Sequence, residues 1–229
     1  MSAGQADAAG GRAGQPRTRP RKPGAGRRRD PTIDDRVRQA ARTLYAREGW
    51  AGFHFEGVAR AAGVSKDAVY RRYSDAEALL LDALSAQPLP LLADDRPVEE
   101  ALVAFGRDVF AYFASGNGYA NLRVHIDGPR YPNVLEQYRD RVVEPQIAQA
   151  VSVLEKAKDA GAIDPDTSTG AVVEALGGAV IVLALAVGAR LDDDGRPDAT
   201  VVRQLTEVVQ QILHGRLTDA PSSTTKRRS

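Results

Sequence analysis

One short stretch of the chain gathers side chains of the kind that proteins use to contact nucleic acid. The outer face of a predicted helix carries two cations, a phenol and a carboxylate, which belong to Lys66, Arg71, Tyr70 and Asp67. Lys66 and Arg71 can donate hydrogen bonds to guanine O6 and N7 in the major groove, or bind phosphate. Asp67 can complement the dipole of its own helix or accept a hydrogen bond from a cytosine amino group. This chemistry predicts a surface that recognises a DNA sequence.

The residues around this face are predicted to form a helix, a sharp turn and a second helix. The apolar positions of the first helix recur at helical spacing, at Phe55, Val58, Ala59 and Ala62. Gly63 then supplies the left-handed backbone that a sharp turn requires, and Ser65 is predicted to cap the second helix. The pattern is that of a helix-turn-helix motif over about residues 54–73, whose second helix enters the major groove.

Two more predicted helices complete a domain over residues 30–87. The first follows Asp30, its predicted N-cap, carries a continuous apolar stripe and ends at Gly49. The last is predicted to open with a capping box, in which Ser74 and Glu77 satisfy free N–H groups of its first turn. Prolines follow this helix and mark the end of the domain.

The rest of the chain, residues 88–215, is also predicted to be helical, because no stretch alternates with the period of a strand. Apolar periodicity predicts helices over residues 98–114, 132–160, 167–191 and 198–214. Pro145 should kink or split the second of these. The third is apolar nearly all round, so we expect it to be buried on most sides.

Positive charge is concentrated at the start of the chain. Residues 1–30 carry eight Lys and Arg against two acidic residues, whereas the whole chain has a net charge of only +1. Residues 1–29 and 216–229 lack aliphatic periodicity and are predicted to be disordered. The first of them is either a solubilising tail or a cationic arm that contacts phosphates, for instance through Arg28 and Arg29. Its position directly before the motif favours the arm.

Several classes of function are disfavoured by what the sequence lacks. It has no cysteine, which excludes disulfides, thiolate catalysis and cysteine-bound metals. His54, His125 and His214 are too scattered to predict a metal site, and no nucleotide-binding or hydrolase motif is present. The most apolar stretch, residues 175–189, is shorter than a membrane span, and no secretory signal is predicted. We therefore expect a cytoplasmic protein with no cofactor, no metal, no membrane partner and no enzymatic activity.

The helix-turn-helix region resembles the DNA-binding domain of the tetracycline-repressor (TetR) family. The resemblance covers residues 32–87, and its marks are Ala40, Ala41, Leu44, Tyr45, Gly49, Val58, Ala59, Ala62, Gly63, Val64, Ser65, Val69, Tyr70, Tyr73, Leu79 and Leu80. Three positions depart from the family pattern. Gly57 lies inside the second helix, where it should cost up to about 1 kcal/mol relative to Ala. His54 stands where the second helix usually starts with Thr or Ser, and Ala76 stands where Lys is frequent. The ring of His54 is still expected to cap that helix, although more weakly.

The resemblance implies an all-α fold, in which an N-terminal three-helix helix-turn-helix DNA-binding domain precedes a larger helical ligand-binding and dimerisation domain. It also implies that Tyr70 contacts the DNA backbone, while the same ring could brace the turn, and that His54 lies where family members contact phosphate. The predicted DNA-binding residues are Ser65, Lys66, Asp67, Tyr70, Arg71, Arg72, His54, Arg28 and Arg29. Of these, Arg72 could face either the DNA backbone or solvent.

A homodimer is expected because one helix-turn-helix motif reads only a few base pairs, whereas two on a two-fold axis read a palindrome. The helices over residues 167–191 and 198–214 are the best candidates for the interface, where they would form a four-helix bundle with their counterparts. The predicted interface residues are Gly177, Gly178, Val180, Ala184, Val201, Leu205, Val208, Val209 and Ile212. The alternative is that the apolar helix is only the core of its own domain.

The same resemblance implies a small-molecule pocket in the larger domain. Its candidate lining residues are Phe105, Val109, Tyr112, Phe113, Arg123, His125, Tyr131 and Tyr138. Arg123 or His125 would be the polar anchor, and for most of the others a place in the structural core is the alternative. A ligand would act by shifting the population of dimers whose reading helices match the operator spacing.

The sequence therefore predicts a DNA-binding transcriptional regulator, a repressor that a small-molecule ligand releases from a palindromic operator. Its partners would be a double-stranded DNA operator, a small-molecule effector of unknown identity and a second copy of the chain. Three alternatives stay open. They are an activator of the same family, a non-specific architectural DNA binder that works through the basic arm, and an enzyme hidden in a helical bundle.

Overall fold

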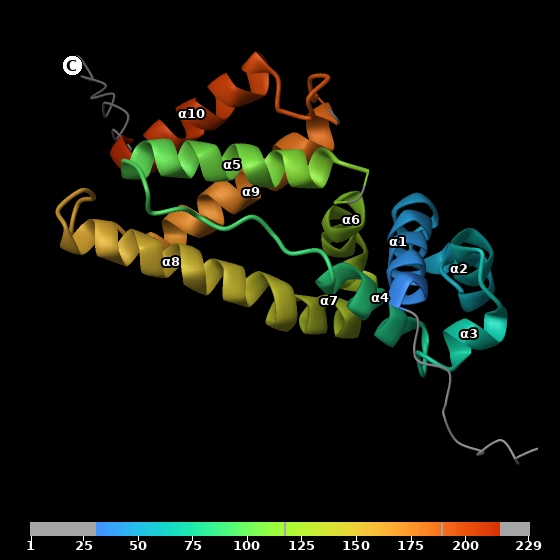
Figure 1. Ribbon diagram of the computed structural model, residues 1–229. Coiled ribbons are helices and arrows are strands. Elements are labelled where there is room, and N and C mark those ends of the chain that lie inside the picture. The colour runs from blue at the N-terminus through green and yellow to red at the C-terminus, as the bar shows by residue number, and fades with distance from the viewer. Residues whose placement is uncertain (1–30, 117, 189, 216–229) are drawn as a thin grey trace, which may run out of the picture. The chain divides into compact units, whose positions relative to one another are not determined.

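The computed structural model describes residues 31–116, 118–188 and 190–215, and Figure 1 shows their arrangement. The predictions for residues 1–29, Asp30 and residues 216–229 lie outside this range. The helices are α1 Pro31–Glu48, α2 Phe55–Ala62, α3 Lys66–Tyr70, α4 Ala76–Ser85, α5 Val98–Ala114, α6 Tyr119–Asp127, α7 Pro132–Tyr138, α8 Glu144–Asp159, α9 Thr169–Val187 and α10 Ala199–His214. Over the described ranges no strand forms beyond an isolated bridge between Leu191 and Pro197. The predicted all-α fold is therefore confirmed.

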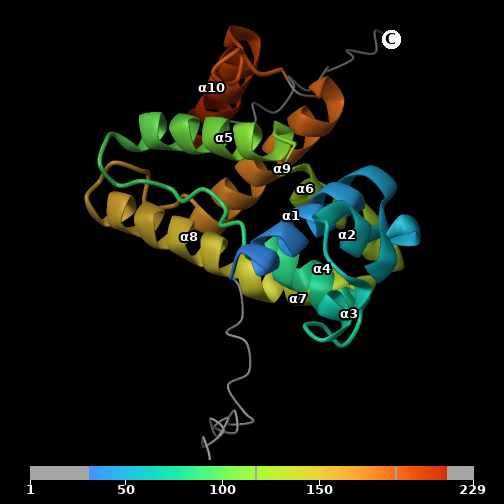
Figure 2. The same cartoon turned by 45° about the vertical axis from the view of Figure 1, so that its right-hand side comes forward.

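Helix α1 packs against α2 and α4 through the apolar stripe that the sequence predicted (Figure 2). The buried side chains of this stripe are Val37, Ala40, Ala41, Leu44 and Tyr45. The helix ends before Gly49, whose φ of 68° lies in the left-handed region. In α2, a Cβ at Gly57 would lie 2.9 Å from Leu44 Cδ2. The missing side chain therefore lets α2 approach α1 closely, which explains a glycine inside a helix.

The turn between α2 and α3 has the predicted geometry, but the start of α2 does not. Gly63 ends α2 with a φ of 64°, and Ser65 caps α3 by accepting the N–H of Ala68 at 3.2 Å. The predicted ring cap of α2 is wrong, because His54 occupies the N-cap position without a side-chain hydrogen bond to the helix. Its Nδ1 lies 2.7 Å from the carbonyl oxygen of Gly52 instead. The 3₁₀ turn that precedes α2 brings that carbonyl within reach of the ring.

The predicted capping box of α4 is also wrong. The N-cap is Asp75, whose carboxylate accepts the N–H of Ala78 at 2.8 Å. Ser74 lies one residue earlier and donates its hydroxyl to Asp75 Oδ2 at 2.8 Å. The backbone hydrogen bond, and next the one from Ser74, lower the pKa of the Asp75 carboxyl. A carboxylate is favoured as the cap because it also interacts with the positive end of the helix dipole.

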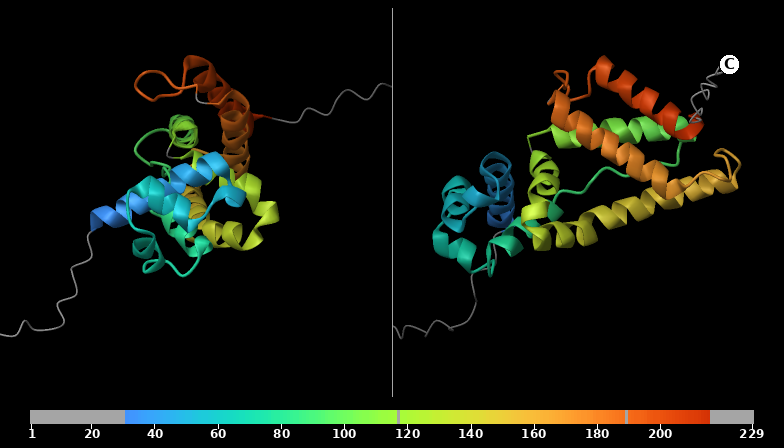
Figure 3. Two further views of the ribbon diagram at one scale, coloured as in Figure 1. Left: turned by 90° about the vertical axis from the view of Figure 1, so that its right-hand side faces the viewer. Right: turned by 180° about the vertical axis from the view of Figure 1, so that it is seen from behind.

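The stretch predicted as one long helix over residues 132–160 is split next to Pro145, as expected. α7 gives way to a π-helical turn over Arg139–Val143, and α8 starts with Pro145 in its first turn. Proline has no N–H and its ring would clash with the carbonyl four residues earlier, and the wider π turn relieves both problems. Figure 3 shows that the two helices still follow one another in a continuous run.

The prediction that the most apolar helix is buried on most sides is wrong for a single chain. α9 is long and apolar enough to cross a membrane by length and composition alone, and only 28% of its most apolar stretch is buried. Val182 and Leu185 are 64% and 46% exposed. One side of α9 packs against α5, α8 and α10. Among the described residues no further helix covers the other side, which is apolar and exposed.

Two hydrophobic cores hold the described helices together, and α6 contributes to both. The first core belongs to the body, which we define as α5 and α8 to α10, and includes Leu122 of α6. The second belongs to the head, which we define as α1 to α4, and includes Ala120 and Val124 of α6 and Tyr138 of α7. α6 therefore presents one face to each core. The domain boundary predicted after residue 87 lies in the connection between α4 and α5 and stays a prediction.

Replacing Asp75 by Ala should lower the free energy of unfolding by about 1 kcal/mol, because the first turn of α4 loses its capping acceptor. Urea unfolding followed by circular dichroism measures the loss. Since folding lowers the pKa of Asp75, the loss should persist above the unfolded pKa of about 3.9 and shrink as the pH falls further. Ser74→Ala is the matched control and should cost clearly less. An equal cost for the two variants would return the capping role to Ser74.

Candidate functional site

The outer surface of α3 brings together the four side chains that the sequence assigned to it. Lys66, Asp67, Tyr70 and Arg71 are all exposed, and we call them the reading face. The Tyr70 ring braces the turn by packing edge-on against Phe55, with 4.7 Å between ring centres. It is also 50% exposed, and its contact with the DNA backbone stays a prediction. The reading face thus offers two cations, a carboxylate and a phenol to a partner.

Glu56 of α2 joins this surface and was not anticipated from the sequence. Its carboxylate pairs with the Lys66 ammonium and accepts a hydrogen bond from the Tyr70 hydroxyl at 3.3 Å. The hydrogen bond between Glu56 and Lys66 lowers the pKa of Glu56 and raises that of Lys66, so both side chains are charged at neutral pH. In the sequence, the only local sign of this role was the position of Glu56 in the first turn of α2, the helix that precedes the turn of the motif. A polyanion that takes Lys66 must therefore displace Glu56.

Arg71 is the cation of the reading face whose side chain has no polar partner among the described residues. It is exposed, and its side chain makes no ion pair or hydrogen bond within the described residues. Asp67 lies in the first turn of α3, where a carboxylate complements the helix dipole. Ser65 and His54 are exposed at the N-cap positions of α3 and α2. The predicted contacts Arg28 and Arg29 lie outside the described residues.

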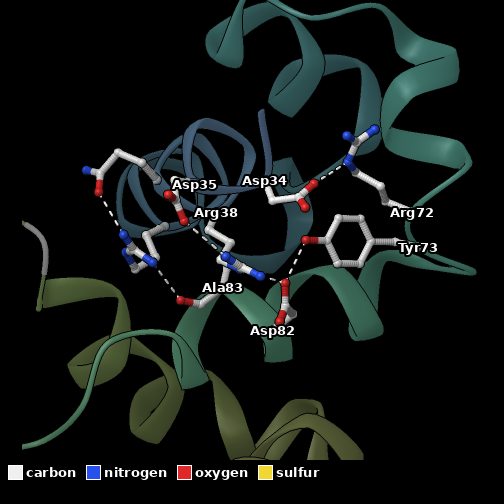
Figure 4. Close-up of polar contacts among 9 residues, drawn as sticks. Asp34, Asp35, Arg38, Arg72, Tyr73, Asp82 and Ala83 are labelled. Atoms are coloured by element: carbon white, nitrogen blue, oxygen red, sulfur yellow. Dashed lines mark hydrogen bonds and ion pairs between the residues drawn. The ribbon is translucent and has the colours of Figure 1, made fainter. Parts of the chain in front are cut away.

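Arg72 extends from the end of α3 into the head, as Figure 4 shows. Its guanidinium pairs with Asp34 of α1 and donates to the carbonyl of Ala68 at 2.8 Å. The side chain is only 10% exposed. Arg72 therefore stabilises the packing of the head. The sequence had suggested that it faces either the DNA backbone or solvent.

A second polar link joins α1, α4 and the residue that follows Arg72 (Figure 4). The Tyr73 hydroxyl donates to Asp82 Oδ2 at 2.6 Å, and Arg38 Nε donates to the same oxygen at 2.9 Å. Burial, and then the bond to Asp82, raises the pKa of Tyr73, so its hydroxyl remains a donor. Together with the Arg72 pair, these contacts fix the end of α3 against α1 and α4. The reading face is thus held by partly buried polar contacts beneath it.

The body contains an apolar pocket of about 210 Å³ between α5, α6, α8 and α9. Four of the predicted ligand residues line it, namely Phe105, Val109, Phe113 and His125. Burial, and next the charge of Arg139, lowers the pKa of His125, so its ring is neutral at pH 7. In the part of the chain that the structure describes, no cluster of side chains that could hold a metal ion occurs. The pocket is lined mostly by apolar side chains.

The other four predicted pocket residues do not line this pocket. Tyr112 donates its hydroxyl to a carbonyl in the connection after α4 at 3.3 Å, and Tyr131 packs on Trp50 with ring centres 5.4 Å apart. Tyr138 is fully buried and accepts a hydrogen bond from the amide of Asn121 at 3.0 Å. The fourth, Arg123, contacts the head. All four residues join separate elements of the structure. For the three tyrosines, this is the structural role that the sequence suggested as the alternative to lining the pocket.

Helix α6 links the pocket to the head through alternate side chains. His125 lines the pocket. Arg123 Nη1 donates to the carbonyl of Ala46 at 2.9 Å, in the last turn of α1, where the negative end of the dipole favours a cation. Asn121 Nδ2 donates to the carbonyl of Leu84 at 3.2 Å, in the last turn of α4. The sequence did not single out Asn121, because its role depends on a carbonyl that is distant along the chain.

The predicted dimer residues divide into a buried and a more accessible set. Five are buried in the body of their own chain: Val180, Ala184, Val201, Leu205 and Val209. The other four, Gly177, Gly178, Val208 and Ile212, are partly or fully exposed, and the two glycines also line the pocket. Val182 borders a shallow groove shared by α9 and α10. The buried set packs α9 and α10 onto the rest of the body. The accessible set forms the surface that these two helices expose.

Comparison with known proteins relates this chain to one group of regulators. Residues 37–83 match the family described as bacterial regulatory proteins, tetR family. Residues 92–209 match the family described as the tetracyclin repressor-like C-terminal domain. The HTH-type transcriptional regulator AqdR of Rhodococcus erythropolis is 28% identical to this chain over 159 residues, which are 67% of this chain and 75% of AqdR.

Solved structures share the fold. A protein described as a TetR-family regulator from Mesorhizobium loti superposes with a TM-score of 0.63 at 19% identity, over 81% of this chain and 97% of that one. The regulator FadR from Bacillus subtilis, solved in complex with stearoyl-CoA, superposes with a TM-score of 0.59 at 12% identity, over 79% of this chain and 98% of FadR. At these identities the likeness concerns the fold alone.

Glu56→Gln should raise the affinity for DNA of any sequence about three- to tenfold at low salt, because it frees Lys66 from a competing carboxylate. Fluorescence anisotropy with a random-sequence duplex measures the change, and added salt should reduce it. The matched control is Asp159→Asn, which removes an exposed carboxylate at the end of α8 and should leave the affinity nearly unchanged. Equal gains for both variants would assign the effect to net charge and not to the Lys66 pair.

Proposed function

The chain belongs to the TetR family of transcriptional regulators, which makes it a DNA-binding regulator of transcription. On that premise we propose that it is a homodimeric repressor, which a small molecule releases from a palindromic operator. The proposal places it in the cytoplasm and gives it no enzymatic role. The observation that carries the proposal is the exposed reading face of α3, which is braced from beneath and has one cation without a partner in the described chain.

Recognition would begin with α3 lying in the major groove. Arg71 is available to donate to guanine O6 and N7 together, the commonest specific contact of an arginine with DNA. Lys66 would exchange the Glu56 carboxylate for a phosphate or a base edge, and the Tyr70 hydroxyl, also released from Glu56, would contact the DNA backbone. The Glu56 pairs would oppose weak, non-specific binding, because DNA must compensate for their loss.

Dimerisation would use the accessible face of α9 and α10. The exposed side chains Val182 and Leu185 favour a partner, because removing apolar surface from water is worth about 25 cal/mol per Å². At Gly178 no neighbouring atom lies within 4 Å of the Cβ position, so a second helix can approach closely there. Two copies on a two-fold axis would read half-sites separated by about 34 Å or a multiple of it.

Release would be transmitted by α6. A ligand in the pocket contacts His125 on the same short helix that holds the end of α1 through Arg123 and the end of α4 through Asn121. A ligand that binds better when α6 is displaced would therefore favour a different placement of the head. The coupling is reciprocal, so operator DNA would weaken the binding of the same ligand.

Selection of sheared genomic DNA on the purified protein at about 0.15 M salt, followed by sequencing, tests the proposed function. Enrichment of a few fragments that share a palindrome is the expected result, and it supplies the operator for later measurements. Retention of all fragments alike, with a steep salt dependence, would contradict sequence-specific recognition. Enrichment of fragments with an isolated half-site would contradict the dimer.

Arg71→Ala should weaken binding to the selected operator by about 1–3 kcal/mol and relax the preference at one base pair of each half-site. Anisotropy titrations against the operator and against single-base variants of it measure both effects. The matched control is Arg141→Ala, which removes an exposed arginine from the π-helical turn of the body and should leave the preference intact. Operator binding by Arg71→Ala that equals wild type would remove Arg71 from the interface.

The double variant Val182→Glu with Leu185→Glu should convert the dimer to a monomer, because it places four carboxylates in the apolar contact between two copies. Sedimentation velocity measures the change, and operator affinity should fall with it. Leu91→Glu is the matched control, since Leu91 is also exposed but lies in the connection between α4 and α5. A dimer that survives the double variant would mean that another surface holds the two copies.

A further inference from the structure

The pocket of the body has a size that restricts what it can hold. Its volume of about 210 Å³ exceeds the roughly 150 Å³ of a cavity that encloses benzene. It lies below the range of about 300–1,000 Å³ that is typical for drug-sized ligands. Scaled from benzene, the space suits a molecule of about eight or nine heavy atoms, which is one ring with a short substituent.

The lining of the pocket selects against charge. Most of its side chains are apolar, and two aromatic rings, those of Phe105 and Phe113, favour a flat apolar ligand. Its polar side chains are His125, Gln146 and Glu174, and no Lys or Arg is among the described residues that line it. An anionic ligand would lose its hydration and meet the carboxylate of Glu174, whereas Arg139, whose charge acts on His125, does not line the pocket.

His125 is the group that can orient a ligand. Its ring contacts Phe113 and Tyr138 edge-on, with centres 6.5 Å and 5.9 Å away. Within the described chain, no hydrogen bond engages either of its ring nitrogens. Neither nitrogen is among the buried polar atoms that lack a partner, so both are accessible to a ligand, to which a neutral imidazole offers one donor and one acceptor. A ligand hydroxyl can donate a hydrogen bond to the His125 ring or accept one from it. It can therefore bond to whichever ring nitrogen faces the pocket.

We propose that this pocket binds a small uncharged phenol-like compound, a single aromatic ring with a short alkyl substituent and one hydroxyl group bonded to the His125 ring. The inference rests on the proposed function, since it names the ligand class of the effector site. It concerns the pocket alone and can be measured without DNA.

Gly177 offers a way to close the pocket without disturbing the fold. It lines the pocket from α9, and no neighbouring atom lies within 4 Å of its Cβ position. Gly177→Leu should therefore fill the space and also raise the helix propensity of α9. Gly170→Leu is the matched control, because Gly170 is in the same helix with the same free space but is not part of the pocket lining.

Calorimetric titration of the full chain at pH 7.5 with para-ethylphenol, para-ethyltoluene and para-methylbenzoate tests the proposal. The phenol should bind about tenfold more tightly than the toluene, because one hydrogen bond separates them, and the benzoate should not bind. His125→Phe should remove the tenfold advantage of the phenol and keep the binding of the toluene. Gly177→Leu should abolish binding of both neutral compounds, while Gly170→Leu should retain it.

Three results would overturn the proposal: binding of the benzoate in preference to the phenol, an unchanged phenol advantage in His125→Phe, or no binding of any probe to the wild-type chain. None of them affects the selection of genomic DNA described above, which uses the ligand-free protein. Failure of the ligand class and failure of the proposed repressor are therefore distinguished. Binding of the phenol with no effect on operator affinity would keep the pocket and reject its role as an effector site.

Discussion

The structure depends on one constraint, which is that helix α6 must fit two hydrophobic cores at once. Ala120 and Val124 pack into the core of the head, and Leu122 packs into the core of the body. Arg123 adds a charge-assisted bond to the end of α1, at a backbone carbonyl that no residue of its own helix can satisfy. A helix held from two sides cannot shift toward one core without changing its contacts with the other. Packed interiors respond to such shifts as discrete alternatives, which is what a switch requires.

The charged side chains of the head separate into those that fold it and those that face outward. Arg72 is committed to Asp34, where both side chains are largely buried. Arg71, its neighbour in the chain, has no partner in the described residues. Lys66 is intermediate, since its partner Glu56 is a partly exposed residue that DNA would displace under the proposed function. An exposed pair contributes little to stability, so under the proposed function its value would lie in opposing contacts with the wrong polyanion.

Local rules predicted the helices, whereas contacts between distant residues were out of reach. Gly63 and Ser65 act within a few residues of themselves, so the turn that presents α3 could be predicted from composition and spacing. The cap of α4 could not, because Ser74 and Asp75 are both good capping residues and only the backbone geometry chooses between them. Arg123 was predicted as a pocket anchor, but it reaches a carbonyl 77 residues away. The face of α9 was misjudged because its apolar pattern is the same whether a neighbouring helix belongs to the same chain or to a second copy.

Cooperative unfolding of head and body is the most direct test of the shared core. The single tryptophan, Trp50, packs on Phe53 in the head and on Tyr131 after α6, so its fluorescence reports the junction, while far-ultraviolet circular dichroism reports all helices. Urea titrations at one protein concentration should give the same midpoint and the same m value by both probes. Loss of the Trp50 signal at clearly lower urea, with most helical signal retained, would mean that the head unfolds on its own and that α6 does not couple it to the pocket.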